Sequence, residues 1–227
     1  MDRRDRNAVN PRFRGIGMTS RRTRERLVQR LAAEGIERPE VLQAIREVPR
    51  HIFVDEALAS RAYEDTALPI GAGQTISQPY VVARMVEAVL GDQPLGRVLE
   101  IGTGCGYQSA VLARVARRVY SVERLSELLF RAREHLHALR VGNVRTRHGD
   151  GFEGWPEHAP YDAIVVSAAP LAMPWAVCEQ LGRRGKMVIP IGAPGAQRLV
   201  RVTRSDDGFD EEVIELVSFV PMLGGAI

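Results

Sequence analysis

The sequence predicts an α/β protein with a doubly wound, mostly parallel sheet, an N-terminal helical extension and a C-terminal antiparallel hairpin. From residue 96 to residue 192, short β-branched apolar runs alternate with stretches of helical periodicity, which is the pattern of strand–helix–strand units. A glycine-rich turn at 102–106 follows the first of these runs and opens a helical stretch. The Asp207-Gly208 turn, set between two strand-like segments, predicts the terminal hairpin.

The N-terminal part is expected to be helical up to a loop. Its expected helices are 18–35, 39–48 and 79–90, with a weaker helical or irregular segment at 51–65. Thr19 or Ser20 can cap the first helix and Gly35 ends it. Residues 68–78 hold two glycines and a proline and show no strong periodicity, so they predict a loop.

The core is expected to alternate strands and helices. Its expected strands are 97–101, 119–123, 143–150, 161–169 and 185–192, and the helices between them are 107–116, 124–140 and 175–182. The run at 161–169 is apolar throughout, as a strand covered on both faces would be. We therefore divide the chain into a basic flexible arm (1–18), a helical part with a loop (19–95) and an α/β core (96–227), the last two forming one compact unit.

Composition limits the class of protein. The 227 residues suit one sizeable domain with extensions. No apolar run reaches the roughly 20 residues that a membrane span needs, and the arginine-bearing N-terminus lacks the apolar core of a secretory signal. Cys105 and Cys178 make neither a disulfide framework nor a metal cluster, so we expect a cytoplasmic protein without a bound metal.

The positive charge is concentrated at the N-terminus. Residues 1–30 hold ten arginines against three acids, a local charge of +7, whereas the whole chain carries +3. The rest of the chain is therefore net acidic. A basic arm could contact nucleic acid or an anionic surface, but the favoured interpretation is a solvated tail.

The glycine turn predicts a ligand site. Glu100 lies two residues before Gly102, and in the turn Gly102-Thr103-Gly104-Cys105-Gly106 the glycines follow a G-x-G-x-G spacing rather than the dinucleotide pattern G-x-G-x-x-G. An acid so close would repel a pyrophosphate and suits a cation better. S-adenosylmethionine carries a sulfonium and an ammonium group and has no phosphate.

Two further acids stand where such a fold places ligand contacts. Glu123 ends the strand after the glycine turn, where a carboxylate binds two ribose hydroxyls. Asp150 ends the third strand and could accept from the exocyclic amine of adenine. Cys105 lies at a helix start, where a thiol pKa can fall, but we interpret it as a small residue beside the cofactor.

The segment QTISQPY, residues 74–80, raises a separate question. Ser77 or Gln78 could simply cap the following helix, with Pro79 in its first turn. Alternatively, the segment presents a hydroxyl group to a ligand.

These motifs together resemble the protein-L-isoaspartate (D-aspartate) O-methyltransferase family. The matching segments are VPRHIFV (48–54), YEDTALPIGAGQTISQPYVVARM (63–85), VLEIGTGCGYQ (98–108), VYSVER (119–124), RHGDGFEGW (147–155), YDAIVVSAA (161–169) and FVPM (219–222). The resemblance begins near residue 21 and leaves only the arm outside. Two small departures are Cys105, where serine is frequent, and Tyr80, where some members have histidine.

The resemblance implies a Rossmann-like, S-adenosylmethionine-dependent methyltransferase that esterifies the free carboxylate of isoaspartyl residues and so starts repair through a succinimide. It implies Ser77 as the active-site residue, with Thr75 and Ile76 in a wall between cofactor and peptide. Val220 and Pro221 would help to clamp the peptide. The implied cofactor contacts are Glu100, Gly102, Thr103, Gly104, Glu123, Asp150 and Gly151.

The residue types fit this chemistry. A carboxylate nucleophile with a pKa of about 4 is already ionised at neutral pH, so no general base is needed. The task left to the protein is positioning and exclusion of water. We hypothesise that the Ser77 hydroxyl orients the isoaspartyl carboxylate.

Three alternatives remain open at this point. A nucleic-acid methyltransferase would usually carry an Asn/Asp-Pro-Pro-aromatic clamp after the fourth strand, where this chain has Ser167-Ala168-Ala169-Pro170. A non-catalytic cofactor-binding module is the second, and a small-molecule O-methyltransferase, which usually needs a histidine base, is the third. A monomer that binds damaged peptides and proteins, with neither a membrane nor a nucleic-acid partner, is the expected state.

Overall fold

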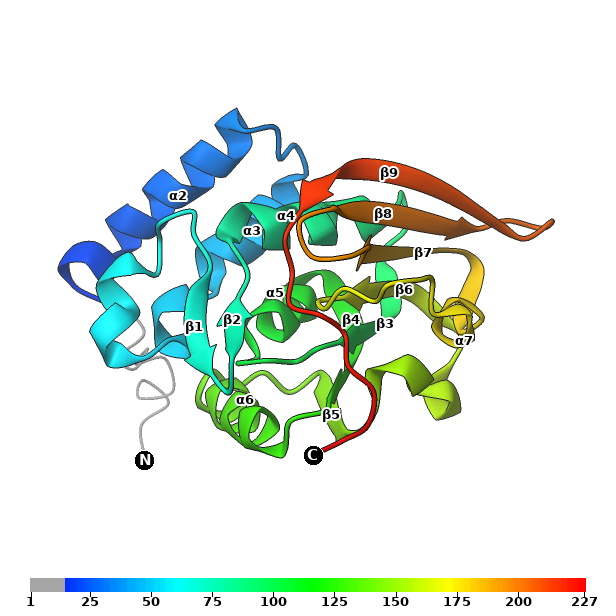
Figure 1. Cartoon of the computed structure of the whole chain (residues 1–227). Coiled ribbons are helices and arrows are strands. Elements are labelled where there is room, and N and C mark those ends of the chain that lie inside the picture. The colour runs from blue at the N-terminus through cyan, green and yellow to red at the C-terminus, as the bar shows by residue number, and fades with distance from the viewer. Residues whose placement is uncertain (1–14) are drawn as a thin grey trace, which may run out of the picture.

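A seven-stranded sheet forms the centre of the computed structural model, which describes residues 15–227 (Figure 1). The strand order is β5-β4-β3-β6-β7-β8-β9. The strands are β3 (Leu95–Ile101), β4 (Ala116–Glu123), β5 (Val144–His148), β6 (Tyr161–Val166), β7 (Leu181–Ile191), β8 (Gln197–Arg204) and β9 (Phe209–Val217). The first five strands along the chain pair in parallel and the last two are antiparallel, so the predicted doubly wound sheet with a terminal hairpin is confirmed. Most of the predicted basic arm falls on residues 1–14 and lies outside the described residues.

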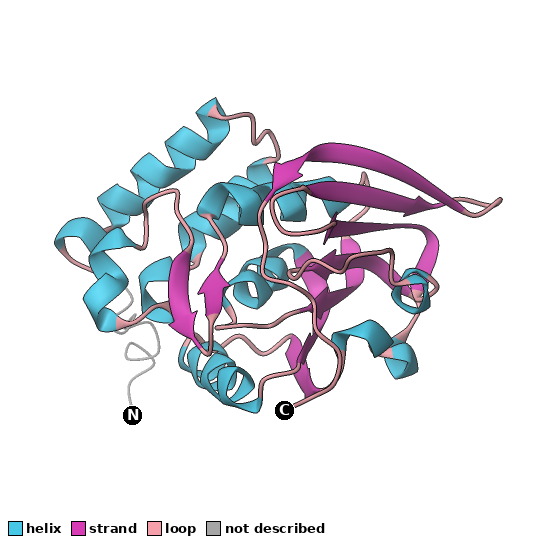
Figure 2. Ribbon diagram, viewed as in Figure 1, coloured by secondary structure: helices cyan, strands magenta, loops and turns pink. Residues whose placement is uncertain are grey.

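Helices cover the two faces of the sheet unequally (Figure 2). The helices are α2 (Arg21–Ala33), α3 (Pro39–Glu47), α4 (Pro79–Val89), α5 (Tyr107–Val115), α6 (Ser126–Ala138) and α7 (Trp175–Cys178). Short 3-10 helices are η2 (Gly17–Thr19), η3 (Arg50–Phe53), η4 (Glu56–Arg61), η5 (Gly151–Glu153) and η6 (Pro156–His158). One face packs against α4, α5 and α6, outside which α2 and α3 add a further layer; the other face packs against α7 and its neighbouring loops. Within residues 15–227, no helix has the length and apolarity that crossing a membrane requires.

The side chains of β3 alternate between the two faces of the sheet, and this alternation determines which apolar cluster each side chain packs into. Val98 packs into the cluster beneath α4 and α5, whereas Leu99 and Ile101 pack into the cluster on the opposite face. Since successive side chains of a strand point to opposite faces, Glu100 shares the face of Val98. This carboxyl group therefore points under α5.

Residues 68–78 differ from the prediction, because they contain a hairpin and not only a loop. β1 (Leu68–Gly71) and β2 (Gln74–Ile76) form a separate antiparallel pair. Gly71, Ala72 and Gly73 make the turn with φ of 90°, 51° and 69°. The Arg131 side chain of α6 donates from Nη2 to the Ile70 carbonyl oxygen at 2.6 Å, which fastens the hairpin to the core.

The predicted helix over 175–182 is also too long. α7 ends at Cys178 and β7 already begins at Leu181. Leu181 pairs with Tyr161 and Lys186 with Ala163, so β7 accommodates a bulge of extra residues opposite β6. The glycines in this stretch lie in the irregular first part of β7 and do not end a helix.

Candidate active site

A cavity lies at the carboxyl ends of β3, β4 and β6, and residues of the β1–β2 hairpin and of the C-terminal segment line it. Its empty volume is about 900 Å³, including open solvent at its mouth. The residues that line the cavity lie within the ranges 70–77, 82, 101–108, 122–128, 151, 167–168 and 220–223.

Glu123 organises the glycine turn from the end of the neighbouring strand. Gly104 N donates to Glu123 Oε2 at 2.8 Å, and Leu125 N donates to Oε1 at 3.0 Å. Gly102 and Gly104 have φ of 91° and 55°, a region that favours glycine. Glu123 lines the cavity together with Gly102, Thr103 and Gly104, so these four predicted cofactor contacts are brought together.

Glu100 lies beneath this wall rather than in it. The residue is fully buried, and its Oε2 accepts from the hydroxyl groups of Ser121, at 2.5 Å, and of Ser109. Its Oε1 accepts no hydrogen bond of normal geometry from residues 15–227. Burial raises the pKa of Glu100 to about 7, against the lowering effect of the two serine hydroxyls.

This shift predicts a pH dependence of stability in the cofactor-free protein. Because an unfolded glutamate ionises near 4.5 and the folded one near 7, the folded state keeps a proton that the unfolded state has lost in this window. The resulting stabilisation is complete below about pH 4.5 and is lost as the pH rises through about 7, a change of roughly 3 kcal/mol. Glu100→Gln cannot ionise and should lack this change. Urea unfolding from about pH 5 to about pH 8 should show the wild type losing stability relative to Glu100→Gln as the pH rises; a difference that does not change with pH would contradict it.

Asp150 and Gly151 are neighbours in the chain, but only Gly151 lines the cavity. Asp150 Oδ1 accepts from Phe152 N at 2.8 Å, and Oδ2 accepts from Gly225 N at 2.6 Å, so this carboxylate anchors the C-terminal segment and is not part of the cavity wall. Gly151 does line the cavity. A Cβ on Gly151 would lie 2.6 Å from Ile101 Cγ2, which requires glycine here.

The hairpin contributes Thr75, Ile76 and Ser77 to the cavity wall. The cap of α4 comes from elsewhere, because Tyr80 N donates to Asp65 Oδ1 at 2.9 Å and Gln78 makes no side-chain cap. Gln78 occupies the N-cap position and Pro79 begins the helix, as predicted, but neither Ser77 nor Gln78 caps the helix with its side chain. Within residues 15–227, the Ser77 hydroxyl has no hydrogen-bond partner and remains available to a ligand.

The C-terminal segment supplies another wall. Ala169 N donates to Val220 O and Met222 N donates to Ala169 O, both at 2.8 Å, so the segment is held at the end of β6. Val220 and Pro221 line the cavity, as the predicted substrate contacts must.

Gln108 and Ser167 are among the polar residues of the wall that sequence reasoning did not assign to the site. Gln108 and Ser167 both line the cavity, and Gln108 Nε2 donates to Ser167 Oγ at 2.7 Å. The available signal was positional, because Gln108 lies in the first turn of α5 and Ser167 directly follows β6.

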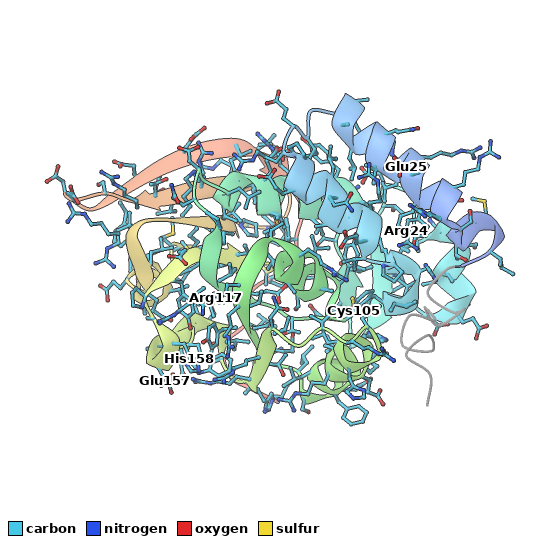
Figure 3. The ribbon with its side chains drawn as sticks, turned by 180° about the vertical axis from the view of Figure 1, so that it is seen from behind. Arg24, Glu25, Cys105, Arg117, Glu157 and His158 are labelled. Carbon is cyan, nitrogen blue, oxygen red and sulfur yellow. The ribbon has the colours of Figure 1, made fainter. Side chains whose placement is uncertain are left out.

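Cys105 is buried at the turn into α5 (Figure 3). Desolvation raises the pKa of its thiol to about 11, so the position at a helix start does not produce a thiolate. In the described part of the chain, no group of His, Cys, Asp and Glu residues could hold a metal ion.

The sheet, the glycine turn and the strand-end acid define the class of Rossmann-like methyltransferases. The family model described as protein-L-isoaspartate(D-aspartate) O-methyltransferase matches residues 22–226. The chain belongs to the protein-L-isoaspartate(D-aspartate) O-methyltransferase family, as its motifs imply.

Individual relatives agree with this assignment. The protein-L-isoaspartate O-methyltransferase of Halorhodospira halophila is 60% identical over 224 residues, covering 99% of this chain and 100% of the relative. That of Pseudomonas fluorescens is 56% identical over 210 residues, covering 92% and 100%.

Solved structures agree on the fold. A protein-L-isoaspartate O-methyltransferase with 31% identity superposes with a TM-score of 0.80, covering 88% of this chain and 66% of that one. A Plasmodium falciparum protein in complex with S-adenosyl-L-homocysteine has 24% identity and a TM-score of 0.74, covering 88% and 98%, and shows the fold alone.

Proposed function

We propose that the protein transfers a methyl group from S-adenosylmethionine to the free carboxylate of L-isoaspartyl residues in damaged peptides and proteins, initiating repair through a succinimide. Family membership supports this reaction. The observation that carries it is the Ser77 hydroxyl, which has no partner within residues 15–227 and lines the same cavity as the glycine turn and Glu123.

The residues present fit S-adenosylmethionine. One oxygen of the buried Glu100 lacks a donor of normal geometry, and among the cavity-lining side chains Arg124 is the single base. A wall with a single base, above a buried carboxyl group, suits a cation better than a pyrophosphate. Gly102, Thr103, Gly104, Glu123 and Gly151 would hold the cofactor, which when bound supplies a methyl group on a sulfonium.

Contacts of Glu100 and Asp150 with the cofactor are supported less directly. Glu100 would act from beneath the glycine turn, because it is fully buried. Asp150 adjoins Gly151 of the wall while both of its oxygens accept backbone N–H groups. Each of these carboxylates therefore also has a structural role in the site.

The chain's own residues then have to position the substrate and exclude water. The isoaspartyl carboxylate is ionised at neutral pH and attacks in line without a general base. The Ser77 O–H donates a hydrogen bond to this carboxylate and orients it. Thr75 and Ile76 on one side, and Val220 and Pro221 on the other, enclose the reacting groups.

The proposal places this protein in the cytoplasm as a monomer. Cys105 and Cys178 are free and buried, as in proteins of a reducing compartment. Because the wall draws on both the helical part 19–95 and the core 96–227, the two parts work as one unit.

The test uses paired peptides that differ only in one isoAsp-Gly or Asp-Gly linkage, with radiolabelled S-adenosylmethionine. Base-labile label in the isoAsp peptide alone is the expected result. Cofactor binding without label in either peptide would instead support a non-catalytic binding module. Equal labelling of both peptides would overturn the proposed specificity.

A further inference from the structure

Ser167 lies at the junction of β6 and the glycine turn. Its backbone N–H donates to Ile101 O at 2.8 Å, and its Cβ lies 3.4 Å from where a Cβ on Gly102 would be. Its half-buried side chain lines the cavity. The residue is therefore fixed by β3 and β6 at the point where the glycine turn begins.

Gln108 determines how the Ser167 hydroxyl can be used. The Gln108 side chain is 7% exposed, and its Nε2 donates to Ser167 Oγ at 2.7 Å. This hydrogen bond holds the Gln108 amide against the Ser167 hydroxyl.

A hydroxyl group has one donor and two acceptor sites. Because the Gln108 amide occupies an acceptor site of Ser167 Oγ, the Ser167 proton is left to donate. No other residue within 15–227 takes that proton. The result is an oriented donor in the wall of a cavity that also holds the Ser77 hydroxyl.

We propose that Ser167 is a second catalytic residue, whose hydroxyl donates a hydrogen bond to the isoaspartyl carboxylate, and that Gln108 is its positioning residue. This inference rests on the proposed function. A carboxylate has two oxygens, of which only one attacks the methyl group. Ser77 from the hairpin and Ser167 from the sheet together fix the plane of that carboxylate.

The first experiment measures steady-state kinetics of Ser167→Ala with the isoAsp peptide. We expect kcat/KM to fall roughly 10- to 100-fold, the range for losing one hydrogen bond to a charged group. The calorimetric Kd of S-adenosylmethionine should stay within about twofold of wild type, and Ser167→Thr, which keeps the hydroxyl, should restore turnover. Ser60→Ala, at an exposed serine of η4, is the matched control.

Gln108→Met removes the amide at similar length and tests the positioning role. It should reproduce the loss of Ser167→Ala, and the double variant should be no worse than either single variant. Additive losses would overturn the role of Gln108. Melting temperatures of all variants separate this coupling from general destabilisation.

Peptide binding to the protein saturated with S-adenosylhomocysteine gives a readout that needs no turnover. Ser167→Ala should weaken binding of the isoAsp peptide by the same factor and leave binding of the Asp peptide unchanged. An unchanged isoAsp affinity, or an equal loss of cofactor affinity, overturns this proposal alone. Wild-type protein that binds the isoAsp peptide selectively but never labels it overturns the proposed function alone.

Discussion

Replacement of Ser77 by alanine is expected to lower kcat/KM for an isoaspartyl peptide roughly 10- to 100-fold, the range for losing a hydrogen bond to a charged group. The Kd of S-adenosylmethionine should stay within about twofold. Since the Ser77 hydroxyl has no partner within residues 15–227, its removal leaves no buried group unsatisfied and should leave the melting temperature unchanged. Steady-state kinetics, calorimetry and thermal unfolding together measure the three quantities.

The control for Ser77→Ala is again the exposed Ser60→Ala. Asp65, which accepts from Tyr80 N, caps α4 in the variant as in wild type, so the helix should not change. A parallel loss of cofactor affinity and turnover would show that Ser77 shapes the cofactor wall instead of orienting the substrate.

Replacement of Glu123 by glutamine is expected to weaken S-adenosylmethionine binding roughly 100-fold, through lost charge-assisted hydrogen bonds. One carboxylate oxygen becomes an NH₂ group, which cannot accept from Gly104 N or Leu125 N, the donors now at 2.8 and 3.0 Å. One of these two backbone N–H groups therefore loses its acceptor, and the ligand loses an acceptor for its ribose hydroxyls. Calorimetric titration with the cofactor measures the effect without any substrate.

Glu127→Gln is the charge-matched control for this variant. Glu127 lies on the next helix with its side chain 74% exposed and pairs only with Arg131, at 3.6 Å, within the described chain. Exposed pairs of this kind contribute little, so its cofactor Kd should equal that of wild type. If the cofactor Kd of Glu123→Gln stays within about threefold of the wild-type value, Glu123 does not hold the cofactor.

The sheet could be predicted from sequence because its signals are local. Most of the central strands contain a short apolar run bounded by glycine or polar residues, as in 161–169. The β1–β2 hairpin could not be predicted in the same way. Its strands are too short to show the alternation of apolar and polar residues that identifies a strand in a sequence. The burial of Leu68 and Ile76 also depends on helices that are distant in the sequence.

The candidate site could be predicted where one short segment both forms the local structure and lines the cavity. The turn 102–104 and the loop 75–77 line the cavity as expected. Glu100 does not line it, because strand alternation turns its side chain under α5, and no motif shows which face of β3 that is. The cap that Asp65 provides to α4 depends on a tertiary contact and was equally hidden.

The C-terminal wall has a consequence for the order in which the site is assembled during synthesis. A nascent chain that has emerged only to about residue 200 contains the glycine turn and Glu123 but lacks Val220 and Pro221. The contacts of Ala169 with Val220 and Met222, and of Asp150 with Gly225, close loops of some fifty and seventy-five residues. The wall of the cavity is therefore complete only after the C-terminal segment has docked at the end of β6.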